Sequence, residues 1–376
     1  MKEISLYIHI PFCKQKCFYC DFPSFAGKEK YREDYINALC KEIKEKCQGY
    51  KIKSIFIGGG TPSYLEVNEI EKLLNEIKKL NFTKNMEFTM ECNPGTVNEE
   101  KFIAMINGGI NRISFGLQSC NDELLKTIGR IHTFEEFLEN YKLARKVGFK
   151  NINIDLMYGL PNLTIEIWKD TLDKICSLKP EHISAYSLII EEDTVFYTLH
   201  MKDKLNLPSE DDEREMDRLT KEILRDNGYH QYEISNYSLI DKECEHNKVY
   251  WKLEEYIGVG TSSSSYINGK RLVNTIDIKD YIEKINKEES VVIEEYTYTL
   301  EDEIEEYMFM GLRLTSGINL LEFKSKFNKD IYSIYKNVIE KNIKRGLLVE
   351  NNSNLLLTKK GIDLANDVMS DFILEK

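Results

Sequence analysis

The chain has 376 residues, of which 42% are hydrophobic and 30% charged, and its formal net charge is -12. It contains no run of 18 or more apolar residues, so we expect a globular protein without an integral membrane segment, built from a large α/β domain and an appendage. An acidic surface repels phosphate backbones, which argues against a nucleic-acid partner.

The N-terminus begins almost directly on an apolar run and lacks the basic segment, long apolar core and cleavage site of a signal peptide, which predicts a cytoplasmic protein. The nine cysteines lack the regular spacing of a disulfide framework. We therefore expect thiols that are reduced or bound to metal. Six have no partner pattern and are interpreted as structural or incidental, namely Cys40, Cys47, Cys92, Cys120, Cys176 and Cys244.

Short β-branched or aromatic runs predict buried strands through the first half of the chain, at residues 5–10, 54–58, 87–91, 112–116, 151–157 and 182–188. Longer amphipathic stretches between them predict helices, at residues 31–47, 67–80, 134–147 and 165–178. This alternation implies parallel strands with right-handed crossovers, and six units favour a partial (β/α)6 barrel, although the pattern also allows an open sheet. In either case a ligand site belongs at the C-terminal ends of the strands.

The second half predicts a different organisation. A charge-rich helix at residues 205–226, with Ser209 as its N-cap, marks the boundary of the repeats. Helices from about residue 300, followed by a hairpin of residues 346–350 and 354–358, predict a small α+β winged-helix-like domain. Residues 301–376 carry 11 Lys and Arg against 13 Asp and Glu, so DNA binding is not expected. We expect a barrel at 1–200, a connecting region at 201–299 and the small domain at 300–376.

A three-cysteine loop follows the first predicted strand, with the sequence Cys13-Lys-Gln-Lys-Cys17-Phe-Tyr-Cys20. One loop with three thiols can wrap three corners of a metal centre, and soft thiolates suit an iron-sulfur cluster or zinc. A structural zinc site needs a fourth protein ligand, for which His9 and Asp21 are the nearest candidates on this tight loop. A cluster with one open iron is the better explanation.

This C-x3-C-x2-C loop resembles the signature of the radical S-adenosylmethionine (SAM) superfamily. In that family Cys13, Cys17 and Cys20 would hold a [4Fe-4S] cluster, and SAM would chelate its open iron. The resemblance implies reductive cleavage of SAM to a 5'-deoxyadenosyl radical, with the protein holding and shielding these species.

Further motifs narrow the resemblance: Tyr7-Ile-His-Ile-Pro-Phe-Cys13, Gly58-Gly-Gly-Thr-Pro62, Glu91-Cys-Asn-Pro94, Ser114-Phe-Gly-Leu-Gln118, Gly129-Arg-Ile-His132 and Asp155-Leu-Met-Tyr-Gly159. In this order they are similar to the branch that contains oxygen-independent coproporphyrinogen oxidase and the HemW-type haem chaperones, over essentially the whole chain. That resemblance implies SAM contacts by residues that line SAM sites in the branch, namely Tyr7, Tyr19, Gly59, Gly60, Thr61, Glu91, Gln118, Arg130 and Asp155. Whether one or two SAM molecules bind is left open.

Two features favour the chaperone over the oxidase. The oxidase pattern has a further cysteine two residues after the third, where this chain has Phe22. The oxidase also carries a longer N-terminal segment before its first strand than this chain does. The segment His246-Asn-Lys-Val-Tyr250-Trp251 also matches the H-N-x-x-Y-W motif of the chaperones. The resemblance implies haem contacts by His246, Asn247, Tyr250 and Trp251, and an imidazole and flat aromatic rings suit haem.

One segment departs from the family. The turn Gly258-Val-Gly-Thr-Ser-Ser-Ser-Ser265 resembles a glycine turn that continues with alanine and histidine in many relatives. This chain has serines there, so we do not expect the contact that the histidine would make.

The resulting hypothesis is a haem chaperone that binds haem as cargo, carries a SAM-ligated cluster and passes haem to an acceptor protein of the respiratory chain. It also expects an electron donor for the cluster. The alternatives are a coproporphyrinogen III oxidase, another radical SAM enzyme or, least favoured, a zinc-binding structural protein.

Overall fold

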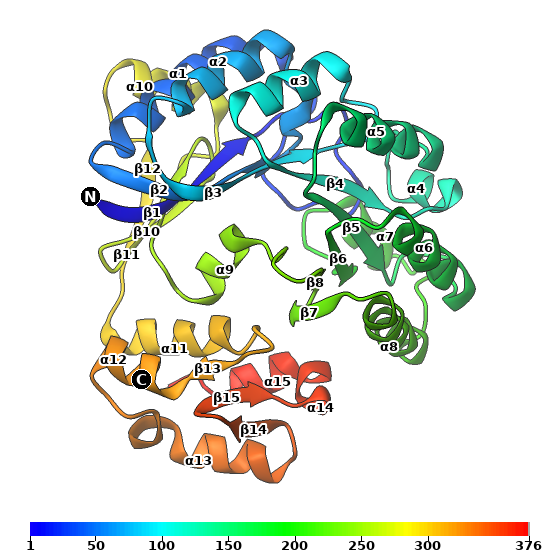
Figure 1. Ribbon diagram of the computed structural model, residues 1–376, viewed down its shortest axis with the longest axis vertical. Helices are drawn as coiled ribbons and strands as arrows, with labels where there is room; N and C mark the ends of the chain where they lie inside the picture. Colours follow the sequence, from blue (N-terminus) through cyan, green and yellow to red (C-terminus); the bar gives the residue numbers. More distant parts are fainter. Residues whose placement is uncertain (375–376) are drawn as a thin grey trace.

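A curved sheet of mostly parallel strands dominates the computed structural model, which describes residues 1–374 (Figure 1). Its central six strands follow one another in sequence order, and every neighbouring pair is parallel. They are β1 (Lys2–Ile10), β2 (Tyr50–Gly59), β3 (Asn81–Cys92), β4 (Arg112–Gln118), β5 (Ile152–Tyr158) and β6 (His182–Ser187). The predicted six-unit α/β architecture is confirmed.

Helices cover the outer, convex face of this sheet in Figure 1. Apolar side chains of the strands, such as Leu6, Ile55 and Ile113, are fully buried against them, which explains the continuous apolar runs in the sequence. The helices and short 3-10 turns are η1 (Glu29–Tyr31), α1 (Arg32–Lys46), η2 (Pro62–Tyr64), α2 (Val67–Ile77), α3 (Glu99–Gly108), α4 (Asp122–Thr127), α5 (Phe134–Val147), α6 (Ile165–Leu178) and α7 (Val195–His200).

The residues expected to form a connecting region add strands to both edges of the sheet. Strands β7 (His230–Glu233) and β8 (Asn236–Ser238) continue it antiparallel beyond β6. At the other edge, β9 (Tyr256–Val259) pairs parallel with β1. Further out lie β10 (Ser264–Ile267), β11 (Lys270–Asn274), α10 (Ile278–Asn286) and β12 (Val292–Thr297). Because β1 and β6 are not neighbours in the resulting order, the barrel is partial and open.

A buried carboxylate fastens β9 and its turn to the barrel. Glu42 is 1% exposed and accepts hydrogen bonds from the Gly260 amide at 2.7 Å, the Tyr281 hydroxyl at 2.6 Å and the Asn274 side chain at 2.8 Å. The serine-rich turn is internally bonded, since Ser263 donates to the Gly260 carbonyl at 2.8 Å. The serines at the site of the family departure thus serve the turn itself.

Helix α8 (Glu210–Asp226) begins at Ser209, whose side chain accepts the Asp212 amide as the predicted N-cap. The helix thus opens on the predicted cap and ends at Asp226, the last residue of the predicted segment. Helix α9 (Glu245–Trp251) follows β8 and lies inside the arc of the sheet in Figure 1.

The C-terminal residues form a small domain below α9 in Figure 1, and its buried core also includes Val249, Leu253, Tyr256 and Tyr266 from the preceding segment. Met308, Phe323, Ile339 and Leu355 are fully buried in it. The predicted hairpin is present as β14 and β15, joined by Asn352 and Ser353 with φ of 51° and 61°, as a tight two-residue turn requires. The elements are α11 (Leu300–Gly311), β13 (Ile318–Asn319), α12 (Leu320–Phe327), α13 (Ile331–Lys344), β14 (Leu348–Asn351), β15 (Asn354–Leu357), α14 (Lys359–Asp363) and α15 (Ala365–Ser370).

Within residues 1–374, no helix is both long enough and apolar enough to cross a membrane. The domain boundaries at residues 200 and 299 stay a prediction.

Candidate functional site

The three-cysteine loop leaves the C-terminal end of β1 and is closed by backbone contacts. The Cys13 amide donates to the Phe25 carbonyl at 3.0 Å, and the Cys20 amide donates to the Cys17 carbonyl at 3.2 Å. All three cysteines are free; Cys13 is buried, and Cys17 and Cys20 are partly exposed. The loop therefore holds three reduced thiols within eight residues at the mouth of the barrel.

Burial raises the pKa of the Cys13 and Cys20 thiols, and for Cys20, where Cys17 adds to the effect, the pKa reaches about 11. Such thiols lose their protons when a metal takes the proton's place. In the described part of the chain, no three His, Cys, Asp or Glu side chains are grouped so as to hold a single metal ion. Zinc needs ligands that converge on one ion, whereas in a cubane cluster each thiolate binds a different iron.

The glycine turn after β2 packs directly against the cysteine loop. A methyl group on Gly60 would lie 2.9 Å from the Phe12 carbonyl oxygen and 3.1 Å from Cys13 Sγ. Gly59 has a φ of +110°, and a methyl group there would overlap the His9 ring. Thr61 donates to Cys13 Sγ at 3.5 Å. Only glycines allow this close approach.

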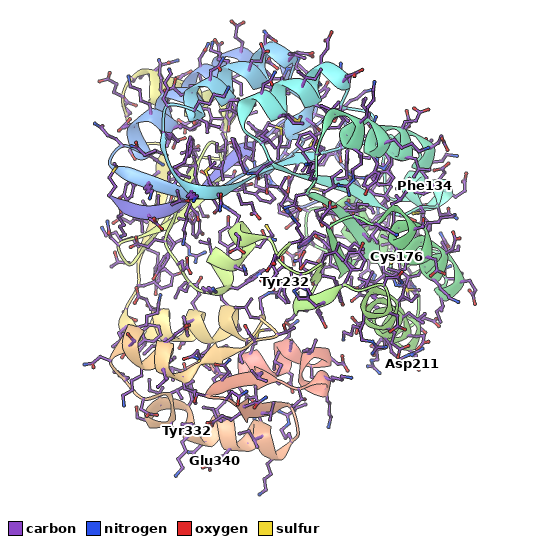
Figure 2. All side chains as sticks on the ribbon, viewed as in Figure 1. Phe134, Cys176, Asp211, Tyr232, Tyr332 and Glu340 are labelled. Carbon is purple, nitrogen blue, oxygen red and sulfur yellow. The ribbon has the colours of Figure 1, made fainter. Side chains whose placement is uncertain are left out.

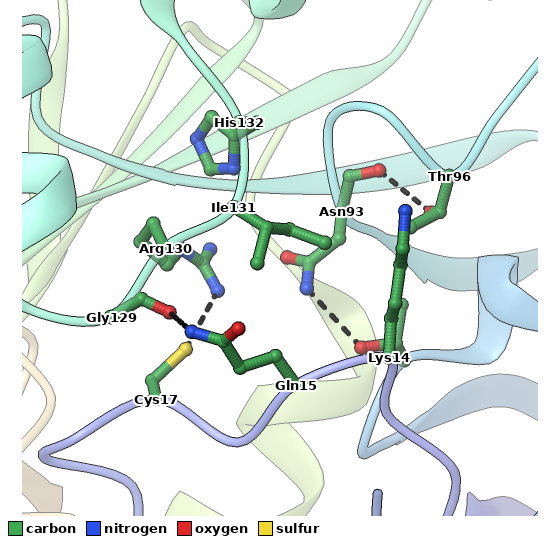
Figure 3. Close-up of a pocket in the computed structure, with 10 residues that line it drawn as sticks. Lys14, Gln15, Cys17, Asn93, Thr96, Gly129, Arg130, Ile131 and His132 are labelled. Atoms are coloured by element: carbon green, nitrogen blue, oxygen red, sulfur yellow. Dashed lines mark hydrogen bonds between the residues drawn. The ribbon is translucent and has the colours of Figure 1, made fainter. Parts of the chain in front are cut away.

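Arg130 reaches the cysteine loop from the segment after α4 (Figure 3). Its Nη1 lies 3.4 Å from Cys17 Sγ, and its Nη2 donates to the Gly116 carbonyl. Its buried Nε has no hydrogen-bond partner among the described residues. The lining of the adjoining pocket includes Lys14, Arg130 and Asn93 but no acidic residue. A guanidinium with one unsatisfied N–H, beside a pocket without acidic residues, suits a ligand with a carboxylate.

Two partly buried carboxyl groups lie on neighbouring parts of the sheet. Glu91, near the end of β3, accepts the Gly59 amide at 3.1 Å, and burial followed by the nearby Asp155 raises the pKa of Glu91 to about 8. Asp155 on β5 accepts from Ser114 at 3.1 Å and Asn153 at 2.7 Å, and burial raises its pKa as well. These two groups can exchange hydrogen bonds with a polar ligand while one remains neutral.

Gln118 ends β4 with a φ of 73°, an uncommon conformation for a side-chain-bearing residue that often marks a functional position. Tyr186 donates to its side-chain oxygen at 3.1 Å. The Tyr7 hydroxyl lies 3.0 Å from His9 Nδ1, and Tyr19 lies close enough to Arg130 for the cation to influence its pKa, although burial dominates and raises it. The predicted SAM residues thus gather around the C-terminal ends of β1 to β5; their contacts with SAM stay predictions.

Three further residues belong to this region although the sequence singled out none of them for the SAM site. His9 Nε2 lies 2.8 Å from the Pro23 carbonyl and so ties β1 to the cysteine loop. Asn93 donates to Thr61 Oγ1 at 3.2 Å, and His132 is 5% exposed beside the pocket of Figure 3. All three lie within the motifs quoted for the branch. Their place in these motifs is the sequence signal by which they could have been found.

Helix α9 carries the H-N-x-x-Y-W motif and is anchored in the barrel. The Glu87 carboxylate on β3 accepts the amides of Glu245 and His246, each at 3.0 Å. His246 is 1% exposed; its Nδ1 lies 2.9 Å from Ser54 Oγ and its Nε2 lies 3.0 Å from the Tyr250 hydroxyl. Burial lowers the pKa of this imidazole to about 3. The predicted haem contact of His246 stays a prediction, and iron ligation would require a hydrogen-bond partner to move.

A chain of polar contacts joins the SAM-side carboxyls to the start of α9. Asn153, bonded to Asp155, lies 2.6 Å from His182 Nδ1, and His182 Nε2 lies 2.8 Å from the Tyr232 hydroxyl. That hydroxyl accepts the Cys244 amide at 3.2 Å. Figure 2 labels Tyr232 beside α9. The barrel interior therefore positions the motif helix from two sides.

The other end of the motif faces the small domain. The Arg313 guanidinium lies 4.5 Å from the centre of the Trp251 ring and 3.4 Å from the Glu233 carboxylate. Trp251 also lines a pocket with an empty volume of about 610 Å³, together with Tyr307 and Asn319. Asn247 and Tyr250 are partly exposed. The motif thus extends from the barrel interior to the junction with the C-terminal domain.

Comparisons with known proteins agree with this geometry. The radical SAM superfamily matches residues 7–175, and the HemN C-terminal domain matches residues 298–364. The heme chaperone HemW of Bacillus subtilis is 38% identical over 376 residues, covering 99% of both chains, and that of Lactococcus lactis is 38% identical over 375 residues, covering 100% of this chain and 98% of its own. The solved coproporphyrinogen III oxidase HemN of Escherichia coli superposes with a TM-score of 0.86 at 23% identity, over 99% of this chain and 90% of its own, which shows a shared fold.

Proposed function

This chain belongs to the radical SAM superfamily and, within it, to the family of the heme chaperone HemW, and from that premise we propose that it binds haem and transfers it to an acceptor protein. The observation that carries this proposal is the 38% identity to HemW over 99% of both chains. The similarity to the oxidase is a similarity of fold at 23% identity and adds no support for its activity.

We assign the [4Fe-4S] cluster to Cys13, Cys17 and Cys20, and SAM to its open iron. When bound, these groups supply a one-electron reducing centre and a source of a carbon radical. The residues around them bind and orient: Arg130 offers its guanidinium to the SAM carboxylate, and the Gly58–Gly60 turn gives the SAM amino group access to the backbone.

Glu91 and Asp155 control protons in this arrangement. Because the pKa of Glu91 is raised to about 8, its carboxyl is protonated near neutral pH and can donate a hydrogen bond, whereas Asp155 is the stronger acceptor beside it.

The proposal includes a cytoplasmic location, an electron donor for the cluster and an acceptor that is a respiratory haem protein. Haem contacts by His246, Asn247, Tyr250 and Trp251 are part of it as predictions from the family motif.

Two parallel assays of the anaerobically reconstituted protein test the proposal. Added haem should produce a Soret band that saturates at a fixed ratio of haem to protein, and coproporphyrinogen III with SAM and a reductant should gain no vinyl groups. Vinyl formation without haem uptake would establish the oxidase instead.

A further inference from the structure

A continuous hydrogen-bond relay crosses the barrel interior from Asp155 to the residue that precedes α9. Its four further members are at most 4% exposed, namely Asn153, His182, Tyr232 and Cys244. They lie on β5, on β6, on β7 and at the N-cap of α9, so segments that are distant in the sequence contribute one member each. Because a buried polar group without a partner is costly, each member is stabilised by the next.

The relay has one direction, which its end groups determine. At one end the Cys244 amide donates to the Tyr232 hydroxyl oxygen at 3.2 Å. At the other end the Asn153 side-chain amide donates to the Asp155 carboxylate at 2.7 Å. The Asn153 side-chain oxygen therefore faces His182 Nδ1 at 2.6 Å, which must carry the proton. His182 Nε2 then accepts from the Tyr232 hydroxyl at 2.8 Å, so every bond donates toward the Asp155 carboxylate.

His182 is neutral in this relay, as its two roles require. Burial, followed by the nearby Arg112 cation, lowers the pKa of His182 well below its usual value. A neutral imidazole has one donor and one acceptor nitrogen, whereas an imidazolium could not accept from Tyr232. The ring therefore transmits the polarity of the relay from β5 to β7 without carrying a charge.

The two ends of the relay belong to the two predicted ligand regions. Asp155 is a predicted SAM contact, and Cys244 precedes the helix that carries the H-N-x-x-Y-W motif. The start of this helix is also held by Glu87, whose carboxylate accepts the amides of Glu245 and His246 at 3.0 Å and lies 3.4 Å from Cys244 Sγ. The position of the helix start thus depends in part on hydrogen bonds that end at Asp155.

A ligand at Asp155 changes the strength of the whole relay. Burial raises the pKa of Asp155, so a cationic group beside it, such as the sulfonium or ammonium group of SAM, favours the ionised carboxylate. An ionised acceptor strengthens the bond from Asn153, and successive hydrogen bonds in a buried network reinforce one another. A helix start that is already fixed loses less entropy when a second ligand binds to it.

We propose that this relay couples the two sites, so that SAM at Asp155 tightens haem binding at α9, with His182 and Tyr232 as the positioning residues. This inference rests on the proposed function, because it requires SAM beside Asp155 and haem at the motif helix. It adds a dependence of one ligand on the other. By thermodynamic linkage, haem must then tighten SAM binding by the same factor.

Titration of each ligand in the presence and absence of the other tests this coupling. The anaerobically reconstituted full-length protein is titrated with haem, followed by the Soret band, without SAM and at saturating SAM. No reductant is present, so SAM binds without being cleaved. Equilibrium dialysis of labelled SAM, without and with haem, gives the reciprocal factor. The variants are Tyr232→Phe, which removes a single oxygen from the relay, His182→Leu, which removes its central ring, and the double variant.

Tyr229→Phe is the matched control. Tyr229 is as buried as Tyr232, at 4% exposure, and its hydroxyl donates to the Pro180 carbonyl at 2.7 Å, outside the relay. Both tyrosine variants lose one buried hydroxyl, so their losses of stability should be similar. Unchanged iron content and circular dichroism would show that each variant is folded.

We expect SAM to lower the haem dissociation constant of the wild type about tenfold, and haem to lower that of SAM by the same factor. In Tyr232→Phe and His182→Leu both factors should fall below about twofold, whereas Tyr229→Phe should keep the wild-type factors. Haem affinity without SAM should change little in all of them. A relay interrupted at one member is interrupted throughout, so the double variant should lose no more coupling than either single variant.

Haem affinity that SAM leaves unchanged or lowers in the wild type would overturn the coupling and leave the proposed function intact. Full coupling in Tyr232→Phe and His182→Leu, or an equal loss of coupling in Tyr229→Phe, would overturn the assignment to this relay. Absence of haem uptake by the wild type, with and without SAM, would overturn the proposed function itself.

Discussion

His246 Nε2 lies 3.0 Å from the hydroxyl of Tyr250, one helical turn further along α9. Its Nδ1 lies 2.9 Å from Ser54 Oγ on β2. Both ring nitrogens therefore have a hydrogen-bond partner, and the imidazole connects the motif helix to the barrel. The H-N-x-x-Y-W motif therefore has a structural role that is visible without any ligand.

The first prediction concerns this bridge. His246→Ala should lower the free energy of unfolding by about 2–4 kcal/mol, because it creates a cavity and leaves Ser54 and Tyr250 without their partner. Urea unfolding measures this loss. Loss of haem binding in a variant of unchanged stability would instead support direct ligation by His246.

The pH dependence of stability gives a second prediction. Since the pKa of His246 is lowered to about 3, the unfolded chain takes up a proton at this residue below pH 6.5 while the folded chain does not. Its neutral form thus stabilises the fold above pH 6.5, and that contribution falls by about 1.4 kcal/mol per pH unit on acidification.

His246→Gln removes this titration, so the stability difference between wild type and variant should shrink as the pH falls from 7 to 5. Chemical unfolding at several pH values provides the measurement. A difference that is constant with pH would show that His246 titrates normally in the folded protein.

The third prediction concerns the cluster. Cys17→Ala should abolish the visible absorption of the reconstituted cluster and reduce bound iron from about four atoms per chain. Cys40→Ala is the matched control, since Cys40 is also free and partly exposed, and it should retain full iron content. Equal iron loss in both variants would contradict the assignment of the loop.

Arg130 provides the fourth prediction. Arg130→Ala should weaken SAM binding by about ten- to a hundredfold, because the charged partner of the carboxylate is lost. The SAM-dependent change in the resonance spectrum of the reduced cluster reports the affinity. Arg145→Ala, which removes an arginine paired with Glu181 elsewhere, should have no effect; an unchanged SAM affinity in Arg130→Ala would exclude this role.

The junction between α9 and the small domain gives the fifth prediction. Trp251→Ala removes the ring that packs on Arg313, a contact worth roughly 1–2 kcal/mol when desolvated, and should increase proteolytic cleavage between β12 and α11. Tyr332→Ala, on the helix at the far end of the domain in Figure 2, should not. Equal cleavage in all three proteins would show that Trp251 does not fasten the domain.

The sequence predicted the parts of this fold that depend on local patterns. The six central strands were visible because strands buried on both faces are continuous apolar runs, and the Ser209 cap and the Asn352–Ser353 hairpin have local chemical signatures. The short outer strands β7 to β12 were not predicted, since their pairing depends on distant partners such as β1 and on the buried Glu42.

In the candidate site, too, the sequence predicted what local motifs specify and missed what depends on distant contacts. Motif order was sufficient to place Glu91, Gln118 and Asp155 near one another, because parallel strands end at one edge. The sequence could not show that Ser54 and Tyr250 occupy both nitrogens of His246, since Ser54 lies 192 positions away and a motif does not indicate exposure.

Haem transfer tests the central claim most directly. Haem-loaded protein is mixed with a purified, haem-free respiratory cytochrome, and the characteristic spectrum of the restored cytochrome is followed over time against the same amount of haem held by albumin. A haem chaperone predicts faster and more complete restoration from the loaded protein. Haem that stays on the protein, or moves no faster than from albumin, would contradict the account.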